Sequence, residues 1–477
     1  MTTSTADLDL LAERAAQAAP VLAASTAAER AAWLRAVADS LDANLAELVA
    51  IADEETALGE TRLRGEVGRT SGQLRLFADV VLEGSYLEAI VDDADPAATP
   101  PRPELRRLLV PLGPVAVYSA SNFPFAFSVL GGDTASALAA GNPVIVKAHS
   151  GHPRLSARTA ELAIEALAAA GAPEGSLALV EGRAAGEALV QHPRIRAAGF
   201  TGSLSGGRAL FDLAAGRPDP IPFYGELGSV NPVVITAAAA AARGEQLAGG
   251  LVGSFTLGAG QFCTKPGVVF VPASAEGFVR TVTAGAADAT GGRLLTERIT
   301  EAFPAGVERL AADPAVRVLA TGSGETAPTV LETDAAAVAE RPGDLLEEVF
   351  GPTTLLVRYA DEAQLLAALD AVPGSLTATL HSEPGDDVAA VLARLSDRAG
   401  RVLFAGWPTG VAVTWSQHHG GPWPSTTSGH TSVGATAIRR FLRPLAFQDA
   451  PQHLLPAALR DESLTGIPHR RNGRLVG

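Results

Sequence analysis

Cysteine is almost missing from this sequence, because Cys263 is the only one among 477 residues. A single thiol excludes a disulfide within the chain and suits a reducing compartment. A lone cysteine is most often a small buried hydrophobic residue. Here, however, it lies in Gly-Ala-Gly-Gln-Phe-Cys-Thr-Lys-Pro-Gly, residues 258–267, between a helical and a strand-like run. Because loops held by rigid elements often carry catalytic groups, this neighbourhood makes Cys263 a candidate for chemistry.

Positive charge and long apolar runs are also scarce. The chain has 37 Lys and Arg against 52 Asp and Glu, a net charge of −15, which disfavours nucleic acid and anionic membranes as partners. The longest apolar stretch, residues 232–242, is too short and too rich in alanine to cross a bilayer. The acidic start, residues 1–11, lacks the pattern of a secretory signal. We therefore expect a cytoplasmic protein.

What the chain does contain is the alternation of an α/β fold. It begins with amphipathic helical patterns over 26–58 and 66–82. Strand-like and helical runs then alternate, which predicts a doubly wound, Rossmann-type parallel sheet with ligands at the carboxyl ends of its strands. The expected strands are 115–118, 144–147, 176–180, 197–200 and 221–224, and the expected helices are 128–140, 155–170, 186–191 and 204–215.

A second α/β block follows Pro232 and should form its own domain. We expect three parts: residues 1–228, with a strand-like ribbon near 93–111 suited to oligomer contacts, residues 229–430, and a proline-rich C-terminal segment, 431–477, that wraps another domain or subunit. In the second part the expected helices are 240–257, 276–288 and 296–311, and the expected strands are 268–271, 316–320, 353–358, 376–380 and 401–404.

Polar residues follow several of the predicted strands of the first part. The amide of Asn122, in Ser-Asn-Phe-Pro-Phe, can donate to an oxyanion or cap the next helix. Lys147 leaves another strand and either reaches a ribose or phosphate or is solvated. Gly202 and Ser203 form a turn before a helix, which favours a phosphate but is also an ordinary helix start.

Three further blocks carry groups suited to catalysis. Glu226 lies between glycines, and a desolvated glutamate there has a raised pKa and acts as a base, although a solvated glutamate is commoner. Glu348 and Phe350, in Glu-Glu-Val-Phe-Gly-Pro, can contact sugar hydroxyls and a flat ring, or simply form a turn. His418 and His419 lie on a glycine-rich loop where surface residues are the default.

In this order the blocks resemble the aldehyde dehydrogenase superfamily over roughly residues 12–448. The resemblance is carried by Asn-Phe-Pro, Phe-Thr-Gly-Ser, Glu-Leu-Gly, Gly-Gln-Phe-Cys-Thr and Glu-Val-Phe-Gly-Pro. Gly-Glu-Leu-Gly-Ser-Val-Asn-Pro, Lys-Ala-His-Ser-Gly-His-Pro and His-His-Gly-Gly-Pro are similar to the α-ketoglutaric semialdehyde (2,5-dioxovalerate) dehydrogenases. Fatty aldehyde dehydrogenases that prefer NADP share much of this pattern and are the alternative.

The resemblance implies NAD(P)-dependent oxidation of an aldehyde to a carboxylate, and favours α-ketoglutaric semialdehyde, which gives 2-oxoglutarate, as the substrate. Cys263 would attack the aldehyde, Asn122 and the Cys263 backbone N–H would hold the thiohemiacetal oxyanion, and Glu226 would activate the water that hydrolyses the thioester. These residues lie on either side of a domain boundary, so they meet only in an interdomain cleft. The resemblance also implies a homodimer or homotetramer and no metal.

Cofactor contacts are implied in the same way. Lys147 and Glu348 would bind ribose hydroxyls, Phe350 would contact the nicotinamide side, and Gly202 with Ser203 would lie at the pyrophosphate. NAD-preferring members often carry glutamate at the position of Ser150, and its absence favours NADP, with NAD also possible.

Other functions remain open from the residues alone. A cysteine hydrolase would pair Cys263 with His418 or His419, but leaves the cofactor-like blocks without a role. A CoA-acylating dehydrogenase is disfavoured because it needs no water-activating glutamate. Arg69 and Arg75 can anchor a substrate carboxylate or form ion pairs on a helix face, and Arg183 is a candidate partner for the phosphate of NADP.

Overall fold

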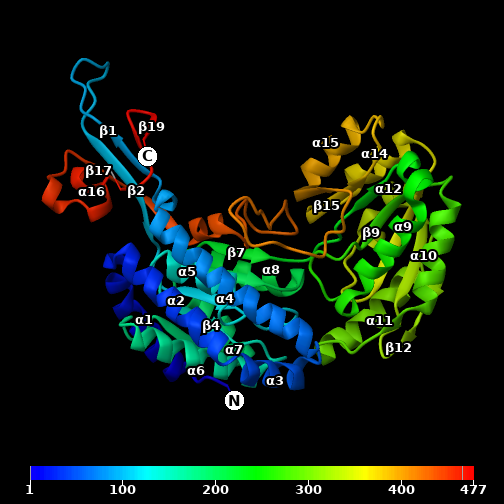
Figure 1. Ribbon diagram of the computed structural model, residues 1–477, viewed down its shortest axis with the longest axis horizontal. Coiled ribbons are helices and arrows are strands. Elements are labelled where there is room, and N and C mark those ends of the chain that lie inside the picture. The colour runs from blue at the N-terminus through cyan, green and yellow to red at the C-terminus, as the bar shows by residue number, and fades with distance from the viewer. Residues whose placement is uncertain (1, 465, 477) are drawn as a thin grey trace.

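The computed structural model describes residues 2–464 and 466–476 and consists of two α/β lobes and a projecting arm (Figure 1). The first lobe is built on a five-stranded sheet of order β5-β4-β3-β6-β7, parallel throughout. Parallel strands need crossovers, and helices supply them here on both faces. Its strands are β3 (Val115–Tyr118), β4 (Val144–Lys147), β5 (Leu177–Val180), β6 (Ala197–Thr201) and β7 (Phe223–Glu226).

The helices of the first lobe include the long α4, which crosses this lobe from the side of the arm and ends beside the second lobe (Figure 1). The helices are α1 (Thr5–Ala24), α2 (Ala27–Ala43), α3 (Leu45–Thr56), α4 (Glu60–Glu83), α5 (Gly132–Ala139), α6 (Pro153–Ala169), α7 (Arg183–Gln191) and α8 (Leu204–Ala215).

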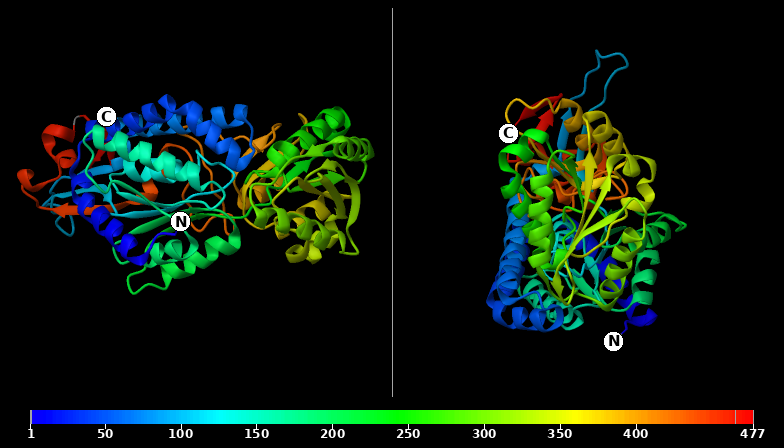
Figure 2. Two further views of the ribbon diagram at one scale, coloured as in Figure 1. Left: turned by 90° about the horizontal axis from the view of Figure 1, so that it is seen from below. Right: turned by 90° about the vertical axis from the view of Figure 1, so that its right-hand side faces the viewer.

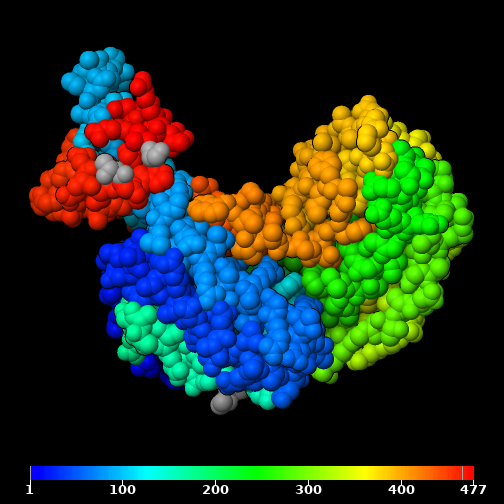
Figure 3. Space-filling model, in the orientation of Figure 1, coloured from blue at the N-terminus to red at the C-terminus, as the bar shows by residue number. Residues whose placement is uncertain are grey.

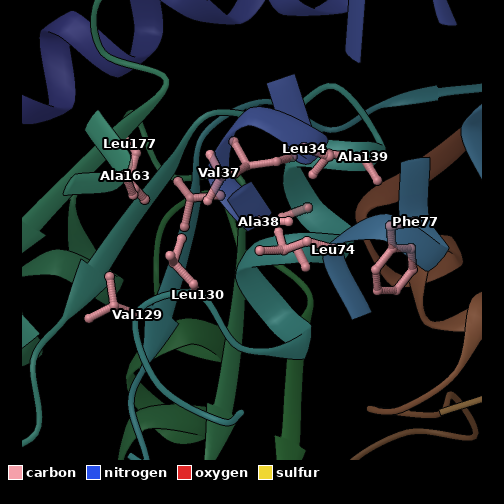
Figure 4. Close-up of a cluster of buried hydrophobic side chains, with 14 of the residues drawn as sticks. Leu34, Val37, Ala38, Leu74, Phe77, Val129, Leu130, Ala139, Ala163 and Leu177 are labelled. Carbon is pink, nitrogen blue, oxygen red and sulfur yellow. The ribbon is translucent and has the colours of Figure 1, made fainter. Parts of the chain in front are cut away.

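Aliphatic side chains from α2 and α4 form the core of this lobe together with the strands beneath them (Figure 4). Leu34 and Val37 on α2 meet Leu74 and Phe77 on α4, each almost completely buried. Removing such apolar surface from water contributes about 1.5–3 kcal/mol per side chain. This packing fixes α4, and with it the arginines that α4 carries toward the active site.

The second lobe contains a seven-stranded sheet of order β11-β13-β14-β9-β8-β15-β16, parallel except for β11 at one edge. The strands are β8 (Val233–Ile235), β9 (Val268–Pro272), β11 (Arg317–Thr321), β13 (Thr329–Asp334), β14 (Thr353–Tyr359), β15 (Ser375–His381) and β16 (Ala399–Phe404). The short β10 (Thr290–Gly291) pairs with β12 (Ser323–Gly324). The helices are α9 (Ala237–Thr256), α10 (Glu276–Asp288), α11 (Glu297–Ala311), α12 (Ala335–Glu340), α13 (Pro342–Leu345), α14 (Glu362–Ala371) and α15 (Ala389–Arg398).

The arm is a third sheet, of order β17-β2-β1-β18-β19, that joins the ribbon to the C-terminal segment. After β16 the chain returns to the first lobe, where the 3-10 helix Ala435–Phe441 contributes buried side chains to the first core. The tail predicted to wrap another domain or subunit pairs with the ribbon of its own chain. The elements are β1 (Ala89–Asp92), β2 (Leu105–Pro111), β17 (Leu442–Gln448), α16 (Asp461–Leu464), β18 (His469–Arg471) and β19 (Arg474–Val476).

The predicted α/β class and the doubly wound first sheet are confirmed. Most predicted elements lie within a few residues of the observed ones, but the strand expected at 221–224 is β7 and is displaced by two residues. Pro220 and Pro222 explain the displacement, because proline has no N–H to donate to a ladder. The elements that were missed include α1, β8, β13, α14 and α15. The domain boundaries at 228/229 and 430/431 stay predictions.

Among the described residues, no helix combines the length and apolar character that crossing a membrane requires.

Candidate active site

The loop that carries Cys263 is a tight turn between α9 and β9. Gly258 and Ala259 both adopt left-handed backbone, with φ of 57° and 54°, and Gly260 follows at 68°. A side chain at Gly260 would collide with the backbone of Gly351, so glycine is required at this close approach. The half-buried thiol of Cys263 is therefore held by the backbone shape of the loop that precedes it.

Asn231 fixes the other side of this loop. Its side chain is fully buried, and its Nδ2 donates to the carbonyl oxygens of Cys263 (2.8 Å) and Lys265 (2.9 Å). Its Oδ1 accepts from the Ser229 hydroxyl and from the Thr377 backbone N–H. The residue also adopts a φ of 50°, which asparagine tolerates better than most side chains. Asn231 is part of the Gly-Glu-Leu-Gly-Ser-Val-Asn-Pro motif, but the sequence predicted no role for it.

Glu226 is the last residue of β7, at the carboxyl end of the first sheet, and is 2% exposed. Its Oε1 lies 3.0 Å from His419 Nε2, and its Oε2 accepts a hydrogen bond of 2.6 Å from the Ser432 hydroxyl. His419 and Ser432 come from the long connection that returns to the first lobe after β16. The carboxylate is therefore held by a segment almost two hundred residues away in sequence.

His419 completes a three-residue cluster, because its Nε2 lies 3.5 Å from Cys263 Sγ. Its Nδ1 is buried and has no hydrogen-bond partner among the described residues. A buried N–H without an acceptor is costly, so the proton belongs on Nε2, where it is donated to Glu226. His419 is thus a donor to the carboxylate, and the tautomer leaves it no lone pair facing the thiol. Sequence reasoning did not distinguish His419 from its neighbour His418.

The sequence led us to expect a raised pKa for Glu226, and this expectation is wrong. Burial, the largest influence, favours the neutral acid, but the electrostatic influence of the His419 imidazole and hydrogen bonds from His419, Ser432 and Cys263 outweigh it. Together they hold the pKa of Glu226 below its ordinary value. Glu226 is therefore a carboxylate at neutral pH.

The thiol shows the opposite behaviour. Burial, followed by the nearby negative charge of Glu226 and a hydrogen bond to it, raises the pKa of Cys263 well above its ordinary value, and Arg69 opposes the shift. The resting site therefore contains a thiol beside a carboxylate. Glu226 is therefore the group that lies in position to accept the proton of this thiol.

Asn122 lies on the loop after β3 and reaches the cysteine loop, where its Nδ2 donates to the Gln261 carbonyl over 3.1 Å. Buried Glu66, on α4, supports this loop by accepting from the backbone N–H groups of Phe125 (2.8 Å) and Ala126 (3.0 Å). Asn122 thus stands two residues from Cys263 along the loop it contacts. Glu66 is a supporting residue that the sequence gave no means to identify.

Two arginines of α4 lie beside the site among phenylalanine rings. The Arg62 guanidinium stacks 5.3 Å from the Phe123 ring centroid and 4.9 Å from that of Phe262. Arg69 lies 5.4 Å from the Phe123 centroid and 5.3 Å from that of Phe127. Burial lowers the pKa of both, and Arg69 Nε has no hydrogen-bond partner within the described part of the chain.

Arg75, the second candidate anchor, is excluded from this site. It pairs with Asp39 (2.6 Å) and Asp42 (2.7 Å) on the surface between α4 and α2. Arg183 is likewise exposed and pairs with Glu187 over 2.9 Å. Arg69 is therefore the arginine that remains as an anchor near the nucleophile.

A cavity of about 1240 Å³ opens between the two lobes and ends at Cys263 and Glu226. This volume exceeds the roughly 300–1,000 Å³ of pockets for drug-sized ligands and is sufficient for a dinucleotide. Gly202 and Ser203 line it where α8 begins, and the Ser203 hydroxyl caps that helix. A helix N-terminus directed into a cavity fits a phosphate. The space-filling view in Figure 3 shows the second lobe adjoining α4 at the rim of this interlobe region.

The cavity contacts most of the predicted cofactor residues, but not all of them. Glu348 and Phe350 line it, as do Asn122 and Ser121. Lys147, at the end of β4, packs against Gly186 and is not among the lining residues. Ser150 is exposed and also lies outside the lining, whereas His149 between them belongs to it.

Half-buried Glu348 and buried Lys265 lie close enough for each charge to influence the other. Burial raises the pKa of Glu348, and Lys265 together with the Ser229 backbone N–H opposes that shift. Lys265 lies two residues after Cys263 in sequence. Its Nζ donates to the carbonyl oxygens of Val349 (3.0 Å) and Thr353 (2.8 Å). The pair connects the cysteine loop to the Glu-Val-Phe-Gly-Pro turn.

A thiol, a buried carboxylate and an amide at the end of a dinucleotide-sized cleft define the class of protein. The model of the aldehyde dehydrogenase family matches residues 1–444, and this chain belongs to that family. The predicted enzyme class, an NAD(P)-dependent aldehyde dehydrogenase, is confirmed.

Among proteins of similar sequence, the α-ketoglutaric semialdehyde dehydrogenase 2 of Azospirillum brasilense is 47% identical, over 98% of this chain and 92% of that one. The α-ketoglutaric semialdehyde dehydrogenase of Acinetobacter baylyi is 41% identical, over 98% of this chain and 91% of that one. The predicted resemblance to this group is confirmed.

Solved structures agree on the fold. Proline utilization A of Bradyrhizobium japonicum superposes with a TM-score of 0.80 at 26% identity, over 94% of this chain, which spans 45% of the length of that protein. The 1-pyrroline-5-carboxylate dehydrogenase from Thermus with bound NAD gives a TM-score of 0.79 at 24% identity, over 94% of this chain and 86% of that one.

Proposed function

We propose that this chain oxidises α-ketoglutaric semialdehyde to 2-oxoglutarate. The names of its most similar relatives support that substrate. The observation that carries the proposal is Arg69, a guanidinium held between phenylalanine rings, close enough to the nucleophile to influence its pKa. Arg69 is half-buried, the charge of Glu66 acts on it, and its Nε has no hydrogen-bond partner among the described residues, so it can still pair with a carboxylate at the end of the substrate remote from the aldehyde. A fatty aldehyde has no group to pair with it.

In the proposed mechanism Glu226 takes the proton of Cys263, and the thiolate attacks the aldehyde carbon. The Asn122 amide and the Cys263 backbone N–H donate to the resulting oxyanion. Loss of hydride converts the thiohemiacetal to a thioester. After it has released the thiol proton, Glu226 deprotonates a water that attacks the thioester, which frees the carboxylate product and regenerates the thiolate.

The residues of the cleft fit a nicotinamide dinucleotide, which when bound supplies the hydride acceptor. Gly202 and Ser203 offer the start of α8 to its phosphates, and Glu348 and Phe350 lie further along the same cavity toward Cys263. Lys147 is assigned to a ribose on the family pattern alone, because its side chain lies outside the cavity lining.

The substrate is tested by comparing kcat/KM for α-ketoglutaric semialdehyde and for a long-chain aldehyde. Replacing Arg69 with Met should lower kcat/KM for the semialdehyde by roughly ten- to a hundredfold, the value of a hydrogen bond to a charged group. Activity on the uncharged aldehyde should change little. Arg75→Met is the matched control, because that side chain pairs with Asp39 and Asp42 on the surface. A preference for the long-chain aldehyde in the parent enzyme would reject this substrate.

NADP is the proposed cofactor, with NAD also used. The support is Ser150, which places no carboxylate three residues after Lys147, where an acid would repel a 2′-phosphate. Ser150→Glu should reduce kcat/KM with NADP and spare that with NAD. Equal losses with the two cofactors would show that Ser150 does not control this choice.

A cysteine hydrolase is the weaker alternative. It needs an imidazole lone pair toward the thiol, whereas His419 Nε2 is occupied by its donation to Glu226. Within the described residues, His419 and not His418 is the histidine that contacts Cys263. We also propose a cytoplasmic homodimer or homotetramer in which the arm supplies contacts between subunits.

A further inference from the structure

The cluster at the end of the cleft has the composition of a metal site as well as of a catalytic one. Cys263 Sγ, His419 Nε2 and a Glu226 carboxylate oxygen all lie within 4.8 Å of one another. Thiolate, imidazole and carboxylate are the three protein ligands that Zn²⁺ prefers. Glu226 and His419 are almost completely buried, at 2% and 0% exposure, so the ligands are already collected by the fold.

Two of the three separations between ligand atoms are close to those around a tetrahedral zinc ion, and the third is within 4.8 Å. Zn–N and Zn–O bonds of about 2.0 Å and a Zn–S bond of about 2.3 Å place neighbouring ligand atoms about 3.3–3.5 Å apart. The observed separations are 3.5 Å for Sγ to Nε2 and 3.0 Å for Nε2 to Oε1. An ion among them therefore requires shifts of a few tenths of an ångström in the hydrogen-bonded pair.

The surroundings supply an open position and outer support. The interlobe cavity reaches both Cys263 and Glu226, which gives an ion a route inward and leaves a fourth position for water. Ser432 donates to the second oxygen of Glu226, and Thr431 Oγ1 accepts from the His419 backbone N–H over 2.7 Å. Such contacts orient metal ligands. The positive charge of Arg69 opposes the binding of a cation, but the two anionic ligands, Cys263 and Glu226, favour it.

We propose that this cluster binds one Zn²⁺ through Cys263, His419 and Glu226, and that the bound ion reversibly inhibits the dehydrogenase. Binding replaces the thiol proton, which is released, and the Nε2 proton of His419, which moves to Nδ1; no electron is transferred. The Nδ1–H so formed has no acceptor among the described residues, and this cost is set against the gain of three metal–ligand bonds. The reaction needs no metal. The ion occupies both the nucleophile and the base, so neither attack on the aldehyde nor hydrolysis of the thioester can begin.

The test uses the full-length reduced enzyme and zinc chloride in competition with a chromophoric chelator. One Zn²⁺ per chain should bind, with loss of activity that EDTA restores. His419→Gln keeps a donor to Glu226 but removes the imidazole ligand, and should weaken zinc binding at least about tenfold, because even outer-shell losses cost that much. Cys263→Ser should do the same. His418→Gln is the matched control and should bind like the parent.

Cobalt gives a readout that does not depend on activity. Because Cys263 is the only cysteine, a thiolate-to-cobalt band on adding Co²⁺ reports that residue alone. The band should appear in the parent and in His418→Gln and weaken in His419→Gln at the same cobalt concentration. Zinc affinity equal in His419→Gln and the parent, inhibition that EDTA fails to reverse, or no cobalt band in the parent would each overturn the proposal.

Discussion

At the scale of single residues, the proposed chemistry depends on the buried negative charge of Glu226. That charge affects the reactivity of the Cys263 thiol and also makes Glu226 a base. Glu226 raises the pKa of Cys263 while its own pKa is held down by His419, Ser432 and Cys263 against the effect of burial. The site therefore rests as thiol and carboxylate rather than as thiolate and acid. A protonated thiol is less reactive, and the nucleophile forms when Glu226 accepts its proton.

Glu226→Gln should separate the two halves of the reaction. The thiol then loses its proton acceptor, but the pKa of Cys263 also falls without the carboxylate charge, so the proton can leave to solvent and attack on the aldehyde and hydride loss continue at a reduced rate. Hydrolysis of the thioester lacks its base and should slow by about 10²–10⁴-fold. Rapid mixing should show a burst of reduced nicotinamide equal to the sites, followed by a slow steady state. A steady state equal to that of the parent enzyme, without a burst, would assign the base to another residue.

His419→Ala should change the pH dependence of the enzyme. Removing the imidazole leaves burial less opposed, so the pKa of Glu226 rises. A carboxylate with a raised pKa is lost as pH falls through the new value, so the acidic limb of kcat/KM moves to higher pH. We expect the loss of kcat/KM in His419→Ala to be largest at the acidic end of the profile and to become smaller as pH rises.

His418→Gln is the control for that profile, because His418 contacts neither Glu226 nor Cys263 in the described structure. A uniform loss in His419→Ala at every pH would mean that the imidazole acts by packing, and not through the charge of Glu226.

At the scale of elements, the nucleophile depends on a loop fixed from two directions. Gly260 lies against the backbone of Gly351 on one side, and Asn231 donates to the Cys263 and Lys265 carbonyls on the other. Both positions require left-handed backbone. The geometry of the thiol is therefore set before any substrate arrives.

Asn231→Asp is the sharpest test of this support. The two side chains have nearly the same shape and both tolerate positive φ, but aspartate directs a carboxylate at two carbonyl oxygens. We expect the free energy of unfolding to fall by about 2–3 kcal/mol, the cost of buried groups left unpaired, and kcat to fall with it. Urea unfolding and steady-state rates measure the two effects. Asn44→Asp, at a half-exposed helix junction, should change neither by as much.

The sequence predicted these elements where their patterns were long and regular. Helix α8 was placed at its observed bounds, and strands β3 and β4 likewise. β8 was missed because three residues cannot show a period, and β7 was displaced by prolines at its start. Secondary-structure patterns also do not reveal tertiary hydrogen bonds, which is why Asn231, Glu66 and Ser432 were not assigned roles.

At the scale of the whole molecule, the site exists only where segments distant in sequence meet. Glu226 ends the first sheet, Cys263 opens the second lobe, and His419 lies on the chain that returns to the first. The family motifs named the first two in advance because each is surrounded by a characteristic block. The motifs did not show which of His418 and His419 belongs to the site, because both are in the same loop motif. Only the contacts in the structure identify His419 as the residue beside Cys263.

The arm leads to a prediction about assembly. It projects away from both lobes (Figure 1), has a small core of its own and leaves Leu454 and Leu475 exposed, at 66% and 72%. Leu475 lies on β19 and Leu454 on the 3-10 helix Gln452–Leu454 between β17 and α16. Large apolar side chains exposed on a projecting arm are typical of a surface that another subunit covers. Leu454→Glu with Leu475→Glu should therefore shift the proposed homo-oligomer to a smaller species in light scattering, because burying two carboxylates in an apolar interface is unfavourable. Leu10→Glu, at a residue of α1 that is 52% exposed, should leave the mass unchanged. A double variant with the mass of the parent would remove these leucines from the interface, and a monomeric parent would reject the oligomer itself.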